Sequence, residues 1–430
     1  MKTIYACFTT SYIHDGHLNI IHEALKYGNL VIGVLSDSAL ITSDKYSLLN
    51  ENERLKLIEG IQGVSKVIIQ NSIFYDEIID EVNPDYIIHG NNWQHGYLNI
   101  VREKLLEKLK SHKCKLIEVN YTVNQFTLKL DQKYQMKLAM PEYRRPRLKT
   151  LLSIVPTIRV MEAHNGLTGL IVEKTIVATD RGLEQFDAIW ISSLTDSTVK
   201  GKPDIELVDM TSRLNTISEI MEVTTKPIIL DGDTGGQIEH FVHNIKTLER
   251  MGVSAIIIED KTGLKRNSLF GTDVKQTQEN PDVFADKIKA GKNAQLTDEF
   301  MIIARIESLI LGVGIEDALI RADKYIQAGA DGILIHSKSK DGKEILEFIA
   351  KFRIQYPEIT LVVVPTTYNH ISFMDLSELK TNIVIYANQL VRSAYPSMLE
   401  TTNRILQDGK SEHIEDSLMP ISSILNILDN

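Results

Sequence analysis

The sequence AIIIEDKTGLKRNS, residues 255–268, contains the strand and the loop around which the rest of the chain can be arranged. Its apolar run stops abruptly at Glu259 and Asp260, as expected of a strand that is buried on both faces and emerges into a polar site. The residues that follow are rich in cations and amide donors, among them Lys261, Lys265 and Asn267. Such a segment could close as a lid over a small phosphorylated acid. Taken alone, it could equally be a solvated loop whose charges keep the protein soluble.

Seven further apolar runs of the same kind surround this one. The eight runs span residues 159–164, 186–193, 227–233, 255–260, 301–307, 332–337, 361–367 and 382–388. Helical patterns lie between them, for example at 237–252 and 314–329. Eight alternations of strand and helix over about 270 residues predict a (β/α)₈ barrel of the TIM type.

Polar residues close each of the eight runs. They are Glu162, Ser192, Ser193, Asp231, Asp233, Glu259, Asp260, Arg305, Glu307, His336, Ser337, Thr366, Thr367 and Asn388. Because the carboxyl ends of barrel strands meet at one mouth, where active sites are built, we expect these side chains to converge. A single one of them could be a structural polar group with satisfied hydrogen bonds, but the complete ring favours a catalytic site.

The converging residues suggest a binding site for a doubly anionic substrate. Asp231 and Asp233, in the sequence LDGDTGG, and Glu259 supply the hard oxygen ligands that Mg²⁺ prefers. Residues two apart on a strand point to opposite faces, so we expect Gly232 to turn the strand end, or one aspartate to act through water. Arg305, Lys265 and His336 could bind a phosphoryl or carboxylate group on the other side.

Several of these motifs carry a family resemblance. The segments WISSLTDST, LDGDTGG, EDKTGLKRNS, ARIES and LIHSKSK, in that order, are similar to those of the phosphoenolpyruvate mutases of the isocitrate lyase superfamily, from about Lys149 to the C-terminal end. The resemblance implies Asp231 as the direct Mg²⁺ ligand, with Asp233 and Glu259 acting mainly through bound water. It also implies a carboxylate site at Ser192, Ser193 and Leu194, an aromatic wall at Trp190 and a further substrate contact from Ser268. Lys265 and Asn267 are implied to lie on a gating loop, Arg305, His336 and Asn267 to contact the phosphoryl group, and Asp204 to be a catalytic aspartate.

The implied reaction moves a phosphoryl group from the enol oxygen of phosphoenolpyruvate to its C3, giving phosphonopyruvate. This chemistry requires charge stabilisation and exclusion of water. Whether Asp204 becomes covalently phosphorylated or only positions the group stays open. Phosphonopyruvate hydrolase activity is one alternative, and carbon–carbon lyase activity is disfavoured because residues 260–270 contain no cysteine for an acid. A catalytically silent scaffold is a further alternative.

The first third of the chain predicts a separate parallel, doubly wound sheet, with strands near 4–10, 30–37, 66–70, 86–90 and 115–119. After the first strand, His14, Gly16 and His17 form an HxGH motif where a helix begins, a position that can hold a polyphosphate. The motif resembles that of the nucleotidyltransferases that include cytidylyltransferases, which implies CTP as a ligand. A histidine pair at a helix start can also be a simple cap.

Two departures from this second resemblance weaken the expectation of activity. Asn92, in HGNNW, stands where the family has an acidic residue, and residues 122–127 replace its ISSTxI motif. The domain is therefore expected to be either an active nucleotidyltransferase or a degenerate one. We expect residues 1–130 to form this domain, 131–150 a linker and 151–430 the barrel.

Composition limits the partners. The net charge of −10 argues against general affinity for nucleic acid or anionic membranes. The chain starts directly in a strand, no apolar run approaches the roughly 18 residues of a membrane span, and its two cysteines fit no disulfide framework, so a cytoplasmic location is expected.

The family resemblance implies a homo-oligomer built by exchange of terminal helices. The apolar segments 397–407 and 417–428 are the candidate interface.

Overall fold

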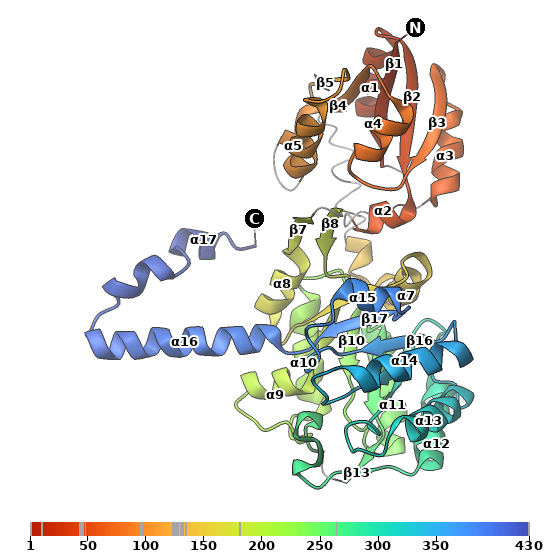
Figure 1. The fold of residues 1–430 in the computed structure, drawn as a ribbon. Helices are drawn as coiled ribbons and strands as arrows, with labels where there is room; N and C mark the ends of the chain where they lie inside the picture. The colour runs from red at the N-terminus through yellow and green to blue at the C-terminus, as the bar shows by residue number, and fades with distance from the viewer. Residues whose placement is uncertain are drawn as a thin grey trace.

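The computed structural model describes residues 2–9, 12–42, 47, 49–94, 98–122, 129, 133, 136–179, 182–263 and 265–428. Two α/β units follow one another along the chain, and a long helix projects from the second (Figure 1). Residues 123–127, predicted to replace a nucleotide-binding motif, lie outside the described part, as does Leu264 in the lid.

The N-terminal unit is the predicted doubly wound sheet. Its strands are β1 (Thr3–Phe8), β2 (Asn29–Leu35), β3 (Val64–Gln70), β4 (Tyr86–Gly90) and β5 (Lys115–Val119). They are parallel and lie in the order β3-β2-β1-β4-β5. The helical segments are α1 (Asp15–Leu25), α2 (Asp37–Thr42), α3 (Glu51–Glu59), α4 (Asp76–Val82), η1 (Asn91–Gln94) and α5 (Leu98–Leu109). The strand order reverses between β1 and β4, the position at which such sheets bind ligands.

The C-terminal unit is the predicted closed barrel. Its strands are β6 (Ile158–Glu162), β9 (Ala188–Ile191), β10 (Ile228–Asp231), β11 (Ala255–Glu259), β14 (Met301–Ile306), β15 (Gly332–Ile335), β16 (Thr360–Val363) and β17 (Ile383–Tyr386). Neighbouring strands are parallel, and β17 pairs with β6 to close the barrel. Each of the eight apolar runs therefore forms a strand, because only a continuous apolar segment can be buried between the barrel interior and the outer helices.

Helices surround the barrel. They are α8 (Gly166–Lys174), α9 (Ser193–Val199), α10 (Met210–Met221), α11 (Ile238–Met251), α12 (Pro281–Ala294), α13 (Ile315–Gln327), α14 (Lys343–Gln355), α15 (Phe373–Glu378) and α16 (Gln389–Asp408), followed by η3 (Glu412–Ser417) and α17 (Ile421–Leu425). Isoleucines of the strands, such as Ile256 and Ile302, pack on Phe241 and Phe284 of α11 and α12 in one continuous core.

The end of the predicted linker is the helix α7 (Pro141–Ile154), which belongs physically to the barrel. Leu148 and Leu151 of α7 are buried against the first residues of the barrel strands, including Ile158 and Ala188. The helix therefore closes the N-terminal end of the barrel. Ile41 of α2 is buried in the same cluster, which joins the two units at this end.

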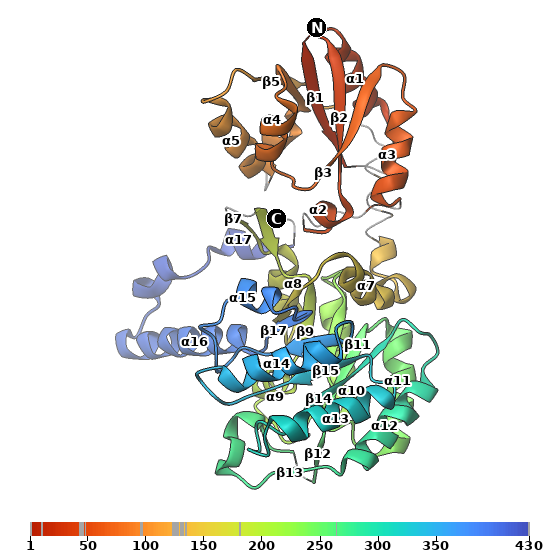
Figure 2. The same ribbon diagram turned by 45° about the vertical axis from the view of Figure 1, so that its right-hand side comes forward.

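An antiparallel hairpin that sequence patterns did not predict reaches from the barrel towards the N-terminal unit. It consists of β7 (Ile176–Thr179) and β8 (Gly182–Gln185) (Figure 2). Leu183 is buried in the core of the N-terminal unit, and Gln185 Nε2 donates to the carbonyl oxygen of Ile41 at 2.9 Å. A second hairpin, β12 (Lys261–Thr262) with β13 (Thr277–Gln278), lies at the other end of the barrel. The barrel mouth therefore opens away from the N-terminal unit.

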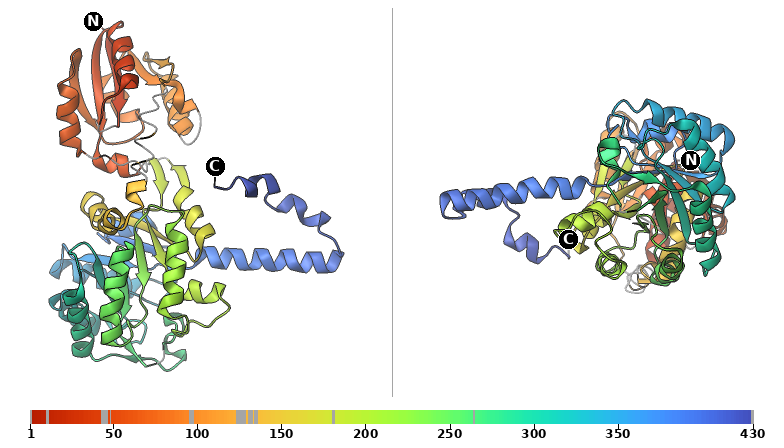
Figure 3. Two further views of the ribbon diagram at one scale, coloured as in Figure 1. Left: turned by 180° about the vertical axis from the view of Figure 1, so that it is seen from behind. Right: turned by 90° about the horizontal axis from the view of Figure 1, so that it is seen from below.

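The helix α16 extends away from the barrel, as views from opposite sides show (Figures 1 and 3). None of its twenty residues, all of them described, is buried. Tyr395, Met398 and Leu406 are exposed, as are Ile421 and Leu425 of α17. Among the described residues, no helix combines the length and the apolar composition needed to span a bilayer.

Candidate active site

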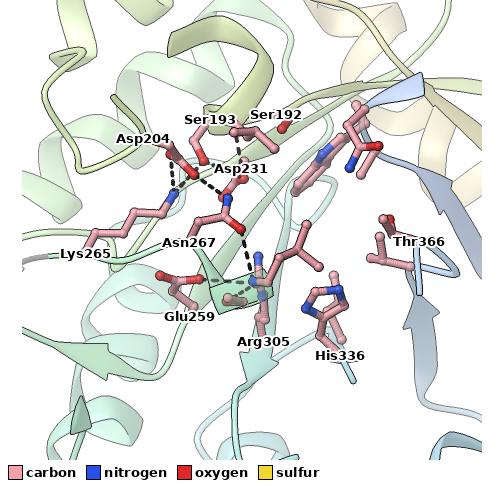
Figure 4. Close-up of a pocket in the computed structure, with 18 residues that line it drawn as sticks. Ser192, Ser193, Asp204, Asp231, Glu259, Lys265, Asn267, Arg305, His336 and Thr366 are labelled. Atoms are coloured by element: carbon pink, nitrogen blue, oxygen red, sulfur yellow. Dashed lines mark hydrogen bonds and ion pairs between the residues drawn. The ribbon is translucent and has the colours of Figure 1, made fainter. Parts of the chain in front are cut away.

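A pocket lies at the carboxyl ends of the barrel strands (Figure 4). It is lined by Trp190, Ser192, Ser193, Leu194, Asp204, Asp231, Glu259, Lys265, Asn267, Ser268, Leu269, Arg305, Leu334, His336, Val364, Thr366, Ala387 and Asn388. Of the barrel residues given a role in the predicted site, only Asp233 is missing from this set. Of the strand-end residues also expected to converge, five do not line the pocket: Glu162, Asp260, Glu307, Ser337 and Thr367. The predicted convergence therefore occurs for part of the ring, because parallel strands place their carboxyl ends at one edge but alternate side chains point away from the pocket.

Four apolar lining residues were not predicted: Leu269, Leu334, Val364 and Ala387. Three of them lie in or directly after barrel strands, where an apolar residue that faces a pocket has the same sequence signal as one that faces the core. Only the closed geometry of the barrel distinguishes the two.

Lys265 is the centre of a buried ionic cluster. Its Nζ is 3.1 Å from Asp204 Oδ1, forms an ion pair with Asp233 Oδ1 and donates to Ser193 Oγ at 2.5 Å. Burial alone would lower the pKa of this amine, but Asp233, Asp231 and the neighbouring carboxylates raise it above its usual value. Lys265 is therefore a permanent cation at this position, and it connects the loop after β11 to the barrel mouth.

The carboxylate of Asp204 is held at both oxygens by that loop. Asn267 Nδ2 donates to Asp204 Oδ2 at 2.7 Å, while Lys265 holds the other oxygen. Asp204 lies in the segment between α9 and α10, which a second contact fastens: Glu206 Oε1 accepts from Thr234 N at 3.0 Å and from Thr234 Oγ1 at 2.7 Å. Glu206 has the left-handed φ of 60°, a strained conformation for a non-glycine residue. Sequence patterns gave no indication of this clamp.

Asp231 and Asp233 have different surroundings. Asp231 lines the pocket, and its Oδ2 accepts from Ser193 N at 3.2 Å and Ser193 Oγ at 2.9 Å. Burial would raise the pKa of Asp231, but the cations Lys265, Arg305 and Arg213 hold it well below its usual range. Asp231 therefore remains ionised in the pocket.

Asp233 does not line the pocket, so the turn at Gly232 does not bring both carboxylates inward. The other alternative, that one aspartate acts through water, stays a prediction. The φ of Asp233, 52°, is left-handed, and its Oδ2 accepts from Arg213 Nη1 at 3.0 Å. The buried Arg213 of α10, which sequence reasoning missed, and Lys265 thus enclose Asp233. Each oxygen of Asp233 thus has a cation as its ion-pair partner.

Glu259 and Arg305 occupy neighbouring strand ends. Glu259 is buried, and its two oxygens accept no hydrogen bond from the described residues. They form ion pairs with Lys261 at 3.2 Å and Arg305 at 3.5 Å. Burial raises the pKa of Glu259 to about 7, in opposition to those cations. Arg305 also pairs with Glu307 at 2.6 Å, and its Nη2 donates to Ser268 Oγ at 2.6 Å.

The site fits a divalent cation in one respect. The buried oxygens of Glu259 without hydrogen bonds, near the ionised Asp231, are hard donors of the kind that Mg²⁺ takes. No group of three or more His, Cys, Asp or Glu side chains in the described ranges is arranged to hold a metal by itself. One or two carboxylates together with water and substrate oxygens are nevertheless a usual arrangement for Mg²⁺.

His336 lies on the opposite side of the pocket from Lys265 (Figure 4). Burial, with a further contribution from Arg305, lowers its pKa to about 3. The imidazole is therefore neutral near pH 7. Its buried Nδ1 has no hydrogen-bond partner among the described residues, which leaves a polar atom available to a ligand.

The HxGH motif of the N-terminal unit forms a capping box on α1. His14 Nδ1 accepts from Gly16 N at 3.0 Å, and the side chain of His17 accepts from His14 N at 3.4 Å. The two rings lie 3.9 Å apart between centroids. Burial and His14 lower the pKa of His17 to about 3, so that His17 is neutral. The predicted capping role is thus present.

Comparisons with known proteins agree with this two-part organisation. The family model described as "Phosphoenolpyruvate phosphomutase" matches residues 148–406, and the model described as "Cytidylyltransferase-like" matches residues 10–150. The protein from Tetrahymena pyriformis named phosphoenolpyruvate phosphomutase is 34% identical over 282 residues, which cover 65% of this chain and 90% of that protein.

Two solved structures are similar to the barrel. The crystal structure of a phosphoenolpyruvate phosphomutase from Streptomyces platensis subsp. rosaceus is 34% identical, with a TM-score of 0.59, over 66% of this chain and 94% of that one. A phosphonopyruvate hydrolase, whose structure contains oxalate and Mg²⁺, is 32% identical, with a TM-score of 0.56, over 64% of this chain and 90% of that one. The first family model spans more than half of the sequence. The chain therefore belongs to the phosphoenolpyruvate phosphomutase family, with a cytidylyltransferase-like domain ahead of the barrel.

Proposed function

We propose that the barrel interconverts phosphoenolpyruvate and 3-phosphonopyruvate by Mg²⁺-dependent intramolecular phosphoryl transfer, the step that forms a carbon–phosphorus bond. One observation carries the proposal. Asp204 is held at both oxygens by Lys265 and Asn267 of the loop after β11, inside a mouth that also contains Arg305 and His336. This arrangement provides a carboxylate beside an anion-binding site with restricted access for water.

The chain's own residues have distinct proposed roles. Arg305, His336 and Asn267 bind the phosphoryl oxygens, and the permanent charge of Arg305 stabilises the metaphosphate-like transition state. The substrate carboxylate lies against Ser192, Ser193 and Leu194, and Trp190 forms the wall beside it. Asp204 receives or positions the phosphoryl group as it moves from the enol oxygen to C3.

Mg²⁺ would be held by Asp231 and Glu259 together with water. When bound, the ion supplies the positive charge that stabilises the substrate enolate. The ion pairs of Asp233 with Lys265 and Arg213 leave it only an indirect role, by orienting water or Lys265.

The two alternative activities, hydrolase and lyase, each require something at the site that the proposed mutase reaction does not. Phosphonopyruvate hydrolase activity requires a water molecule at the phosphoryl group, where Lys265 and Asn267 now cover Asp204. Carbon–carbon lyase activity is disfavoured, because both cysteines of the chain, Cys7 and Cys114, precede the barrel and no loop cysteine can act as an acid.

A phosphorus NMR assay tests the proposed function. With phosphonopyruvate and Mg²⁺, the full chain should produce phosphoenolpyruvate, and removal of Mg²⁺ with a chelator should abolish the conversion. Readdition of Mg²⁺ should restore it. Accumulation of pyruvate and phosphate without phosphoenolpyruvate would select the hydrolase, and no turnover of either kind would refute both activities.

For the N-terminal unit we propose CTP as the ligand, bound at the HxGH motif. The supporting observation is the capping contact of His17, which uses one ring nitrogen as an acceptor and leaves the other to donate to a phosphate oxygen. Burial, which lowers the pKa of His17, is consistent with this neutral ring. The motif begins α1 directly after β1, at the reversal point of the sheet. Nucleotidyl transfer to a phosphonate is the activity that this ligand would serve.

A calorimetric titration of the full chain with CTP and Mg²⁺ tests this second proposal. We expect binding in the micromolar to millimolar range, which His17→Ala weakens, while the exposed His22→Ala on the same helix does not. Pyrophosphate release with a phosphonate acceptor would extend the result to catalysis. Absence of binding at millimolar CTP would leave the unit a structural domain.

We further propose the boundaries 1–130, 131–150 and 151–430, with the last part of the linker packed on the barrel as the start of α7. A cytoplasmic location and a homo-oligomer are also proposed. Both cysteines are thiols, which suits a reducing compartment. The exposed apolar residues of α16 and α17 require a cover that one copy does not supply, and a second copy is the proposed cover. Sedimentation should then give a mass above the 48.6 kDa of one chain.

A further inference from the structure

Lys261 is a buried cation with no part in the proposed chemistry. It begins β12, directly after β11 and Asp260, and only 4% of its surface is exposed. Its Nζ donates to the carbonyl oxygen of Arg266 at 2.9 Å, to Ser268 Oγ at 2.9 Å and to Gln276 Oε1 at 3.0 Å. All three acceptors lie in the segment 261–278, which is called the lid below. The three protons of this ammonium are therefore all used on the lid.

The charge of Lys261 is balanced from the barrel. Its Nζ lies 3.2 Å from Glu259 Oε1 and 3.4 Å from Glu307 Oε2, at the ends of two neighbouring strands. Ser268 links the same groups, because its hydroxyl accepts from Arg305 and donates to Glu307. The Lys261 side chain thus connects residues 266, 268 and 276 of the lid to Glu259 and Glu307 at the strand ends.

Among the described residues, Lys261 makes no contact with Asp204, the residue that the catalytic side chains of the lid hold. Lys265 and Asn267 contact Asp204, whereas Lys261 binds the backbone carbonyl of Arg266 and the side chains of Ser268 and Gln276. The root of the lid is fixed independently, since β12 pairs with β13 and Gln278 Nε2 donates to Asp260 Oδ2 at 2.9 Å. Lys261 therefore makes the contacts that hold the part of the lid between the β12–β13 pairing and the catalytic residues Lys265 and Asn267.

We infer that Lys261 is a positioning residue that holds the lid closed over the pocket. Its loss leaves the root and the contacts with Asp204 in place but releases the middle of the lid. Glu259 and Glu307 still have Arg305 as a partner, so the barrel should tolerate the change. The expected consequence is a larger population of open lid, with access for water to the phosphoryl group.

Limited proteolysis of the full chain measures the open population without any assay of activity. Trypsin must attack the carbonyl of Arg266, an exposed residue, and this carbonyl oxygen is the one that Lys261 binds. In Lys261→Met, cleavage between Arg266 and Asn267 should become about tenfold faster, because a charge-assisted contact is lost and cleavage follows the open population. Mass spectrometry identifies the bond, and cleavage after the exposed Lys110 normalises the rate.

Two further variants supply a control and a second probe of the Lys261 contacts. Lys275→Met removes an exposed lysine of the same lid and should leave the rate unchanged. Gln276→Ala removes one lid acceptor of Lys261, cannot disturb the barrel core, and should accelerate cleavage by a smaller factor. It carries the test if Lys261→Met folds poorly by circular dichroism. Unchanged cleavage in both Lys261→Met and Gln276→Ala would overturn the inference.

A second measurement rests on the proposed mutase function. Water that reaches the phosphoryl group of phosphonopyruvate adds its oxygen to phosphorus. The carbon–phosphorus bond then breaks and C3 takes up a proton, which gives pyruvate and phosphate. Phosphorus NMR should show the ratio of phosphate to phosphoenolpyruvate rising several-fold in Lys261→Met relative to Lys275→Met. An unchanged ratio despite faster proteolysis would refute the role in water exclusion. If the wild-type chain shows no isomerisation, the mutase proposal fails while the proteolysis result still decides the role of Lys261.

Discussion

Replacing Asp204 with alanine should lower the rate of phosphonopyruvate isomerisation by at least about 10³-fold, since an electrostatic group at the reacting centre is commonly worth that much. The side chain faces the pocket and lies within reach of Lys265 and Asn267. Stability should change by no more than about 1 kcal/mol, because Lys265 keeps its ion pair with Asp233. Phosphorus NMR gives the rate, and thermal unfolding gives the stability.

The comparison for this prediction is Asp286→Ala, which removes an exposed carboxylate from α12 and should leave the rate unchanged. Asp204→Asn keeps an acceptor for Asn267 but no charge, so it should be nearly as slow as the alanine variant. If Asp204→Ala retains more than about one tenth of the rate, the aspartate cannot be a carrier of the phosphoryl group.

Replacing Lys265 with methionine should abolish detectable isomerisation and also destabilise the barrel. The ammonium is buried beside Asp204, Asp231 and Asp233. Its removal takes the cation from Asp204 and leaves Asp233 with Arg213 as its ion-pair partner. Breaking a buried ion pair in this way costs roughly 3–5 kcal/mol. Denaturant unfolding monitored by barrel tryptophan fluorescence at Trp190 measures the loss.

The loss of stability in Lys265→Met should depend on pH in a defined direction. Burial already raises the pKa of Glu259 to about 7, and Lys265 is one of the cations that oppose this rise. Without Lys265 the folded-state pKa rises further above the unfolded value of about 4.3, so the folded state binds more protons. The loss of unfolding free energy in Lys265→Met should therefore be larger at pH 8, where Glu259 must ionise, than at pH 5.

Lys265→Arg is the matched control, because it keeps the charge with a different donor geometry. It should recover most of the stability but little of the activity, since Asp204 and Ser193 lie at distances set by a compact ammonium. Equal stability of Lys265→Met and the wild type, or the same deficit at both pH values, would contradict the central place of Lys265 in this cluster.

The sequence by itself determined the two folds and most of the barrel mouth. Eight apolar runs ending in polar residues were sufficient, because strands buried on both faces must be apolar and parallel strands bring their ends together. Glu259, Arg305 and His336 were found in this way. Asp204 lies between helices rather than at a strand end, so only the family resemblance indicated it.

The tertiary structure alone decided which neighbours these side chains meet. The left-handed turn at Asp233 directs that carboxylate to Arg213 of α10 and away from the pocket. Lys261 is indistinguishable in sequence from a solvated loop lysine, yet its side chain is buried between the lid and the strand ends. The hairpin of β7 and β8 likewise joins the two units through residues too few to form a periodic pattern. The physical reason is common to all three: local patterns report burial and strand direction, whereas contacts between distant segments depend on how the connections at the two ends of the closed barrel fold in space.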